Sequence, residues 1–307
     1  WQRPGPEVIG VRHHWEATMT ESTSALFAPL AGRGFIKVDD EEAAPFLQTI
    51  LTANIDQISA GGCAPGALLT PQGRILHDMM IYHCSNVSDA GSHFIIEADG
   101  AGLADLFTRL RRYRLRRPVG LRVVEDMTIW LCWGAPLDIE GVYHDPRHQS
   151  LGYRWLGQGD EMPPFATIAT RGEITQWQAL RIAAGVPEGP LDLTPERALM
   201  LEAGLDMLGA VDFEKGCYIG QEVTARTHYR GLVKRRLVPL HLPAGVPPTP
   251  GTEILLGEKA VATTKTAAKA ERGSLCLALI KLSDLHLVLD GAAKLQIDGS
   301  PADLVIP

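Results

Sequence analysis

The sequence predicts an α+β fold with antiparallel or mixed sheets, followed by a small C-terminal β-barrel. Strand, helix and hairpin patterns mix along residues 34–231, which favours α+β over a doubly wound parallel sheet. After residue 231 the pattern changes to short β runs separated by glycine and proline, which is typical of a small barrel. The sequence contains no dinucleotide-binding glycine motif, no Walker A motif and no H-E-x-x-H.

The first predicted elements are a strand over residues 34–38 and a helix over residues 39–51. Either Asp39 or Asp40 can cap the helix, because an aspartate side chain accepts hydrogen bonds from the free amides at a helix start. The apolar side chains of the segment share one helical face, formed by Phe46, Leu47, Ile50 and Leu51.

Further elements alternate along the middle of the chain. In order, they are a hairpin over 67–84, a strand over 93–98, an amphipathic helix over 101–113, strands over 119–126 and 128–134, and a helix over 174–189. Pro71 and Gly73 fit the tight turn of the hairpin, and Gly185 ends the last helix. Residues 195–208 form either another helix or an irregular apolar segment, since Gly204 disfavours a helix.

The C-terminal region begins with five prolines in residues 239–250. Short β runs follow at 253–256, 260–264, 274–282, 285–289 and 293–297. Repeated short strands of this kind predict the barrel.

Length and charge set broad limits on function. The 307 residues suggest about two domains, and a net charge of −7 gives no overall attraction to nucleic acid. The five cysteines are odd in number and form no C-x-x-C, which argues against a disulfide framework and a paired-cysteine zinc site. Reduced thiols indicate a cytosol-like compartment, and no apolar run is long enough for a membrane span.

We divide the sequence into three parts. Residues 1–18 lack the pattern of a secretory signal and are expected to be a poorly ordered extension before Met19. Residues 19–231 form the bipartite α+β region, and residues 232–307 form the barrel domain.

Cys217 is the first candidate for chemistry, within VDFEKGCYIGQEVTAR at residues 211–226. A helix that starts near residue 220 places Cys217 close to its positive end, and Lys215 is two residues away. Both would lower the pKa of the thiol and favour the nucleophilic thiolate. A thiol packed in the core is the alternative, but the polar neighbours Lys215, Gln221 and Glu222 favour a functional role.

Asp78 and Glu202 are acidic residues in apolar surroundings. Strand periodicity places Asp78 on one face with Met80 and Tyr82, where its carboxylate can receive N–H groups of a ligand or pair with Arg74. Glu202 lies in an apolar run and can bind a heterocycle, or it lies on an exposed helix face.

Two further groups could bind a ligand. Trp177 and Arg181 have i, i+4 spacing and can form a stacking platform, although a core tryptophan is the more common arrangement. Residues 109–118 carry six arginines, which can bind phosphates, RNA or a polyanionic tail. The overall acidity favours a solvated helix face instead.

KGCYIGQE at residues 215–222 resembles the signature of the YgfZ family of folate-binding proteins, which is related to the glycine-cleavage T-protein. Mitochondrial iron–sulfur assembly factors of the same group share this signature. The resemblance extends over residues 22–290, including GRGFIKVDDEEAAPFLQTILTANI, ALLTPQGRILHDMMIY, LRIAAGVPEG, LEAGLDMLGAVDF and GLVKRRLVPL.

The resemblance implies two intertwined α+β lobes and a β-barrel around a central opening that binds tetrahydrofolate or a one-carbon derivative. It implies that Asp78 and Glu202 hold the pterin and that Gln221 and Glu222 orient the loop of Cys217. The T-protein pattern has two acidic residues after the hairpin turn, whereas this chain has His77 and Asp78. This departure disfavours true aminomethyl transfer, so enzymatic activity stays open.

The function that the resemblance implies is support of iron–sulfur cluster assembly or repair, with Cys217 as the essential thiol and Lys215 as its activator. The expected partners are folate and iron–sulfur enzymes or assembly factors, with direct tRNA contact disfavoured. A folate-dependent aminomethyl- or methyltransferase is one alternative, and a tRNA-modification factor that acts through iron–sulfur enzymes is another. A single thiol is not expected to hold a stable cluster. The expected location is the bacterial cytoplasm, or the mitochondrial matrix in a eukaryote.

Overall fold

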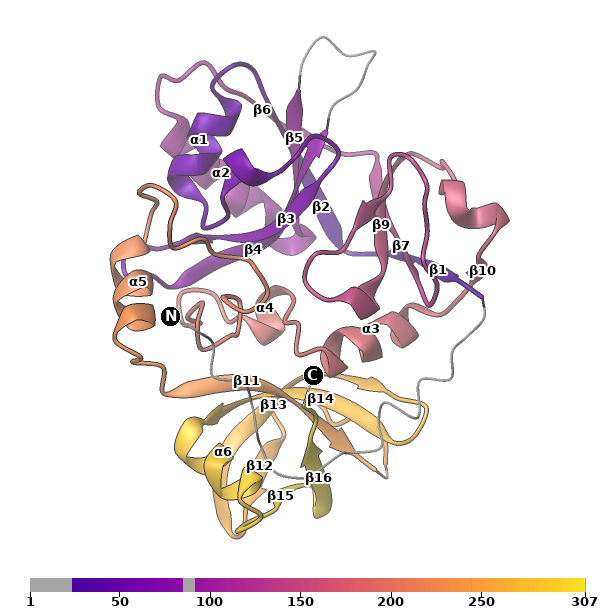
Figure 1. Cartoon of the computed structure of the whole chain (residues 1–307), viewed down its shortest axis with the longest axis vertical. Helices are drawn as coiled ribbons and strands as arrows, with labels where there is room; N and C mark the ends of the chain where they lie inside the picture. The colour runs from indigo at the N-terminus through magenta and orange to yellow at the C-terminus, as the bar shows by residue number, and fades with distance from the viewer. Residues whose placement is uncertain (1–23, 85–91, 244, 307) are drawn as a thin grey trace.

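The computed structural model describes residues 24–84, 92–243 and 245–306. Figure 1 shows two α+β lobes above a barrel that contains the C-terminal strands. The predicted extension over residues 1–18 lies outside the described residues.

The first lobe is a five-stranded sheet with two helices on one face. Its strand order is β3-β4-β5-β2-β6 and all its pairs are antiparallel. The strands are β2 (Arg33–Asp39), β3 (Cys63–Leu69), β4 (Ile75–Cys84), β5 (His93–Asp99) and β6 (Gly120–Val124). Alternate residues such as Ile36, Ile81 and Ile96 pack against α1 (Ala43–Ile50) and α2 (Leu103–Arg114) in one core.

The second lobe is a five-stranded sheet with the order β10-β1-β7-β9-β8. Its strands are β1 (Leu26–Leu30), β7 (Met127–Trp133), β8 (Tyr143–His144), β9 (Tyr153–Gln158) and β10 (Thr170–Arg171). The lobes are intertwined, because β1 lies in this sheet, β2 to β6 build the first lobe, and the chain returns at β7. The opposite face of the first sheet packs on this lobe through Phe35, Met80 and Tyr82.

The third part is a closed barrel with the order β11-β14-β13-β12-β15-β16. Its strands are β11 (Arg235–Leu242), β12 (Glu253–Leu256), β13 (Lys259–Lys269), β14 (Ser274–Lys281), β15 (Leu295–Ile297) and β16 (Ser300–Leu304). The structure therefore confirms the predicted α+β class with a C-terminal barrel.

The strand predicted over residues 285–289 is wrong, since these residues belong to α6 (Leu282–Leu289). Leu282, Leu285 and Val288 pack on the barrel core with helical spacing, whereas Leu287 and Leu289 are exposed. The alternation in LHLVL is too short to separate a period of two from a helical period.

The helix predicted over residues 39–51 is shorter than expected and begins at Ala43. Asp39 ends β2, and Asp40 has a left-handed backbone with φ 74°. Neither aspartate side chain caps the helix, although the Asp40 carbonyl accepts a hydrogen bond from the Ala43 amide.

The remaining segments join the lobes to the barrel. The helices here are α3 (Ile174–Ala183), the single turn α4 (Gly189–Asp192) and α5 (Gln221–Tyr229). Residues 195–208 form turns and no regular helix, in agreement with the irregular alternative, and Gly204 has φ 75°. None of the helices in the described part of the chain has the length and apolar character needed to cross a membrane.

Candidate functional site

Cys217 lies on a loop that leads into α5, and the helix begins close to the predicted residue. Gly220 immediately precedes α5 with φ 82°. A Cβ at Gly220 would lie 2.6 Å from the Thr70 carbonyl oxygen, so the turn of the β3–β4 hairpin approaches the helix start too closely for another residue. The hairpin turn therefore fixes the end of the Cys217 loop.

Cys217 is the exposed cysteine among the five in the chain. Cys132 and Cys276 are buried, while Cys63 and Cys84 are half-buried. Burial raises the pKa of the thiol to about 12 in Cys63, about 11 in Cys132 and about 12 in Cys276. These three thiols stay protonated at neutral pH, and exposure makes Cys217 the accessible sulfur.

Lys215 is buried under this loop and binds backbone carbonyls of the first lobe. Its ammonium group donates hydrogen bonds to the carbonyl oxygens of Leu51 at 2.9 Å and Ala53 at 2.5 Å. Burial lowers the pKa of Lys215 to about 8, against the opposing attraction of Asp212 and Asp56. These contacts make Lys215 an anchor of the loop.

Asp212 fixes the same loop from its other end. Its carboxylate accepts hydrogen bonds from the amides of Glu214 (2.7 Å) and Lys215 (3.2 Å) and from the side chain of Asn54 (2.7 Å). These hydrogen bonds outweigh burial and hold the pKa of Asp212 below its ordinary value. The Thr52 hydroxyl donates to the Ala210 carbonyl, so the part of the loop before Cys217 is tied to residues 51–54, while the hairpin turn holds its other end at Gly220.

An open groove with a volume of about 570 Å³ adjoins the loop. The first lobe supplies one wall, and the segment before Cys217 supplies the other with Phe213 and Glu214. The Phe213 ring stacks on His228 with centroids 3.9 Å apart, and the Tyr229 hydroxyl lies 3.4 Å from a Glu214 carboxylate oxygen. A groove of this size is large enough to receive part of a ligand or a partner segment.

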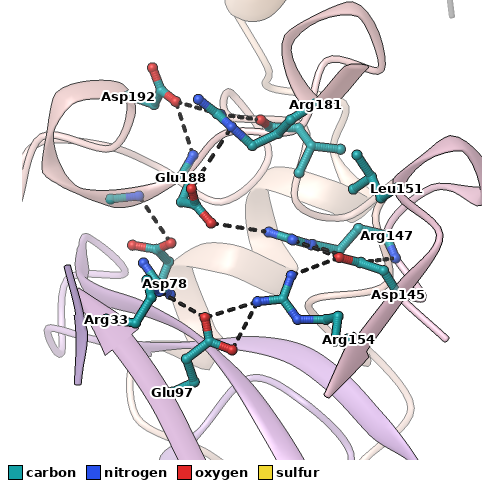
Figure 2. A network of polar contacts seen from close by, with 12 residues as sticks. Arg33, Asp78, Glu97, Asp145, Arg147, Leu151, Arg154, Arg181, Glu188 and Asp192 are labelled. Carbon is teal, nitrogen blue, oxygen red and sulfur yellow. Dashed lines mark hydrogen bonds and ion pairs between the residues drawn. The ribbon is translucent and has the colours of Figure 1, made fainter. Parts of the chain in front are cut away.

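A second group of polar residues lies where the lobes meet (Figure 2). Arg154 on β9 is fully buried and donates to both Glu97 carboxylate oxygens at 2.8 Å, to Asp145 at 2.9 Å and to the Tyr82 hydroxyl at 2.7 Å. Arg33 also donates to Glu97, at 2.8 Å. We name this set, together with Asp78, Arg147, Arg181, Glu188 and Asp192, the central charge network.

Asp78 projects into this network from β4, as Figure 2 shows. One of its carboxylate oxygens accepts a hydrogen bond from the Gly189 amide at 3.2 Å. Burial raises the pKa of Asp78, and Arg33 and the Gly189 amide oppose this shift. His77, at the place of a second acidic residue, instead contacts Asp105 at 2.8 Å.

Glu202 lies in a different place, beside a cavity of about 180 Å³ between the lobes and the barrel. Arg235 donates to both of its carboxylate oxygens, at 2.9 and 3.3 Å. The cavity is smaller than the roughly 300 Å³ at which ligand pockets usually begin. The Glu202 carboxylate is therefore already paired within the chain.

Trp177 and Arg181 are core residues and form no open stacking platform. Trp177 is 0% exposed and donates to the Leu151 carbonyl. Arg181 is 2% exposed, donates to Asp192 at 3.0 Å, and also bonds Thr266 of the barrel. Both residues lie on α3 as predicted, but the face of the helix that carries them points inward.

Gln221 and Glu222 open α5. The Gln221 side chain donates weakly to the Gly216 carbonyl at 3.5 Å, across the base of the Cys217 loop, while Glu222 is exposed. The structure thus brings Gln221 and Lys215 to the Cys217 loop, and it places Asp78 and Glu202 at separate positions.

Sequence reasoning missed the network residues Glu97, Asp145, Arg147 and Arg154, which carry no local motif. Over residues 24–84, 92–243 and 245–306, no group of three or more His, Cys, Asp or Glu could hold a metal ion.

Known proteins resemble both the sequence and the fold. Residues 234–307 match the family described as "CAF17, C-terminal beta-barrel domain". The glycine cleavage system aminomethyltransferase T from Bartonella henselae shares the fold, with a TM-score of 0.72 over 92% of this chain and 85% of that chain. At 15% identity this likeness concerns the fold alone.

Curated relatives match over most of the sequence. The human protein named "Iron-sulfur cluster assembly factor IBA57, mitochondrial" is 34% identical over an alignment of 304 residues, and the match covers 89% of this chain and 83% of that protein. The mitochondrial IBA57 homolog of Pyricularia oryzae is 38% identical over an alignment of 226 residues, and the match covers 70% of this chain and 57% of that protein. The mouse IBA57 is 33% identical over 82% of this chain and 76% of its own length. Identity at this level along most of both chains establishes that the protein belongs to the CAF17/IBA57 family.

Proposed function

We propose that this protein is an iron–sulfur cluster assembly factor and that Cys217 is its working thiol. The names of its IBA57 relatives support the first part. The single observation that supports the second is the exposure of Cys217 on a loop tied to the first lobe by Lys215 and Asp212. The relatives are mitochondrial, so we propose the mitochondrial matrix as the site of action rather than a bacterial cytoplasm.

The proposed chemistry follows from a single soft ligand at the protein surface. A thiolate sulfur binds iron well, but one sulfur fills one coordination position. The other ligands of an iron–sulfur cluster would come from a partner, and the cluster is cargo rather than a resident group. The role of this chain is to present the sulfur at a fixed place, and the anchored loop is suited to that role.

The test replaces Cys217 with serine in cells that lack the endogenous protein. The expected result is a Cys217→Ser variant with normal abundance and thermal stability that does not restore the activity of iron–sulfur enzymes. Cys84→Ser, which alters a half-buried thiol, is the matched control and should restore activity. Full restoration by Cys217→Ser would remove the thiol from the proposal.

We also propose tetrahydrofolate, or a one-carbon derivative, as a ligand. The resemblance of KGCYIGQE to the YgfZ family and the half-buried carboxylate of Asp78 support this. The fit is partial, because Arg235 already pairs with Glu202. The measurement is a calorimetric titration of wild type, Asp78→Asn and Glu202→Gln, with the bound folate identified by mass. Binding that is unchanged in both variants would contradict a site formed by these two carboxylates.

Aminomethyl transfer is a weaker proposal, because His77 replaces one of the two acids that the resemblance associates with it. An effect on tRNA modification would follow indirectly from the support of iron–sulfur enzymes. Neither aminomethyl transfer nor the indirect effect on tRNA modification requires a further site in this chain.

A further inference from the structure

The last turn of α2 and the turn that follows it carry the most concentrated positive charge in the sequence, and the proposed function does not use it. We call residues 111–117 the arginine turn. Arg111, Arg112, Arg116 and Arg117 are exposed. Among the residues that the structure describes, these four form no ion pair with an acidic side chain, whereas Arg109, one helical turn earlier, pairs with Asp105 at 2.6 Å. Four exposed guanidinium groups without an acidic partner among the described residues therefore gather on a protein whose net charge is −7, and the Arg111 group also lies 5.9 Å from the centre of the Phe107 ring.

The arginine turn has a defined shape. Arg114 donates from its side chain to the Val119 carbonyl at 3.2 Å, and the Arg117 amide donates to the Arg114 carbonyl at 3.0 Å. The Val119 amide closes the turn on the Arg117 carbonyl at 2.9 Å. These contacts hold the exposed side chains on an ordered piece of backbone.

Leu115 lies at the centre of the arginine turn in an unusual state. It is 81% exposed, and its backbone has φ 53° and ψ −114°, a region that disfavours residues with a Cβ. A glycine after the last helical residue would relieve this strain. Leu115 therefore contributes no buried apolar surface to the fold, and its backbone conformation is strained. A contact with another molecule would account for an exposed leucine at this position.

The side chains of the arginine turn favour an acidic protein over a nucleic acid as the anionic partner. All of its basic residues are arginines, which suit paired hydrogen bonds to carboxylates or phosphates. The turn has no exposed aromatic ring on which a nucleic-acid base could stack, since Tyr113 is half-buried. The projecting apolar side chain of Leu115 fits a protein surface better than a phosphate backbone.

We propose that the arginine turn is a docking surface for an acidic segment of a partner protein, in which carboxylates pair with Arg111, Arg112, Arg116 and Arg117 and an apolar contact receives Leu115. The surface lies on α2 and the turn that follows it, in the helix-bearing part of the first lobe (Figure 1). It uses no residue of the Cys217 loop, so it goes beyond the proposed thiol function and can fail or hold independently of it.

The test measures fluorescence anisotropy with a labelled glutamate-rich peptide that carries interspersed valines, and with the same peptide in which glutamine replaces glutamate. The glutamate peptide should bind wild type, with an affinity that falls as salt is added. Arg111→Glu/Arg112→Glu should weaken binding by roughly tenfold or more, because two attractive contacts become repulsive. Lys269→Glu/Arg272→Glu makes the same change of charge at exposed positions of the barrel and should leave the affinity unchanged.

Leu115→Gly separates docking from folding. This variant should raise the melting temperature, because glycine accepts the backbone angles of residue 115, and should still weaken peptide binding several-fold. Cys217→Ser should bind the peptide as wild type does, even where it fails to support iron–sulfur enzymes. Equal binding of the glutamate and glutamine peptides, or insensitivity to both arginine-turn variants, would overturn the proposal. Tighter binding of total tRNA or of phosphatidylglycerol vesicles, lost in the same variants, would also overturn it.

Discussion

The ammonium group of Lys215 donates a 2.9 Å hydrogen bond to the carbonyl of Leu51, a residue 164 positions earlier in the chain. This contact joins the loop of the exposed Cys217 to the segment that follows α1. Lys215 and Cys217 are near neighbours in sequence, yet the lysine turns inward and the cysteine outward. Lys215 therefore anchors the loop to the first lobe, while Cys217 keeps its sulfur accessible at the surface.

Replacing Lys215 with methionine should destabilise the protein by about 2 kcal/mol, because the carbonyls of Leu51 and Ala53 lose a charged donor. Methionine keeps most of the buried chain, so lost packing contributes little. Urea unfolding measures the change. Lys234→Met, at an exposed position, is the matched control and should stay within about 0.5 kcal/mol of wild type.

The same lysine predicts a dependence of stability on pH. Its pKa is about 8 in the folded protein, whereas the unfolded chain keeps the proton up to the ordinary value of 10.5. Between these values the unfolded state binds more protons, so this residue makes folding more favourable as pH rises. The difference in unfolding free energy between wild type and Lys215→Met should therefore grow from pH 8 to pH 10. A difference that shrinks over this range would contradict the buried, partly deprotonated amine.

Thiol labelling provides a test of accessibility. Native protein should show one fast-reacting thiol with a disulfide reagent such as DTNB, and Cys217→Ser should lose that phase alone. Burial protects Cys132 and Cys276 and raises the pKa of both thiols, so they should react only on the timescale of unfolding. A fast phase that persists in Cys217→Ser would identify Cys63 or Cys84 as more accessible than their half-buried positions indicate.

Local patterns in the sequence predicted the elements that have a clear period or a turn signal. The hairpin turn at Pro71 and Gly73 and the start of α5 near Gly220 follow from such signals. The strand prediction over residues 285–289 is wrong because a run of five residues fits both a strand period and a helical period. Periodicity also cannot show which side of a helix faces the core, and Trp177 lies on the buried side.

The site itself was harder to predict, because its parts come from distant segments. The residue spacing of Lys215 and Cys217 suggested an activating amine, but the carbonyls that hold this amine belong to residues 51 and 53. The sequence offered no local signal for them. The same holds for Arg154, whose acidic partners Glu97 and Asp145 are brought together by the packing of two sheets. Long-range contacts of this kind become visible only in the folded chain.

Arg154 should be among the residues whose loss costs most stability. Arg154→Met removes the cation that the fully buried carboxylates of Glu97 and Asp145 share. Arg33 and Arg147 still pair with these carboxylates, so we expect a cost of about 3 kcal/mol, the low end for a broken buried ion pair. Arg122→Met is the matched control, because Arg122 is exposed and lies 4.0 Å from its acidic neighbour Asp39. That control should change the unfolding free energy by less than about 1 kcal/mol.

Acid unfolding of the same variants tests the electrostatic cause of this loss. Burial opposes the ionisation of Glu97, but Arg154 and Arg33 outweigh it and lower its pKa to about 2. In wild type this carboxylate therefore contributes stability above its ordinary pKa of 4.5, and the contribution is lost as pH falls toward 2. Without Arg154 the pKa of Glu97 rises, so Arg154→Met should unfold at a higher pH than wild type or Arg122→Met. Equal acid midpoints, measured by circular dichroism, would show that the cost of Arg154→Met comes from lost packing and not from charge.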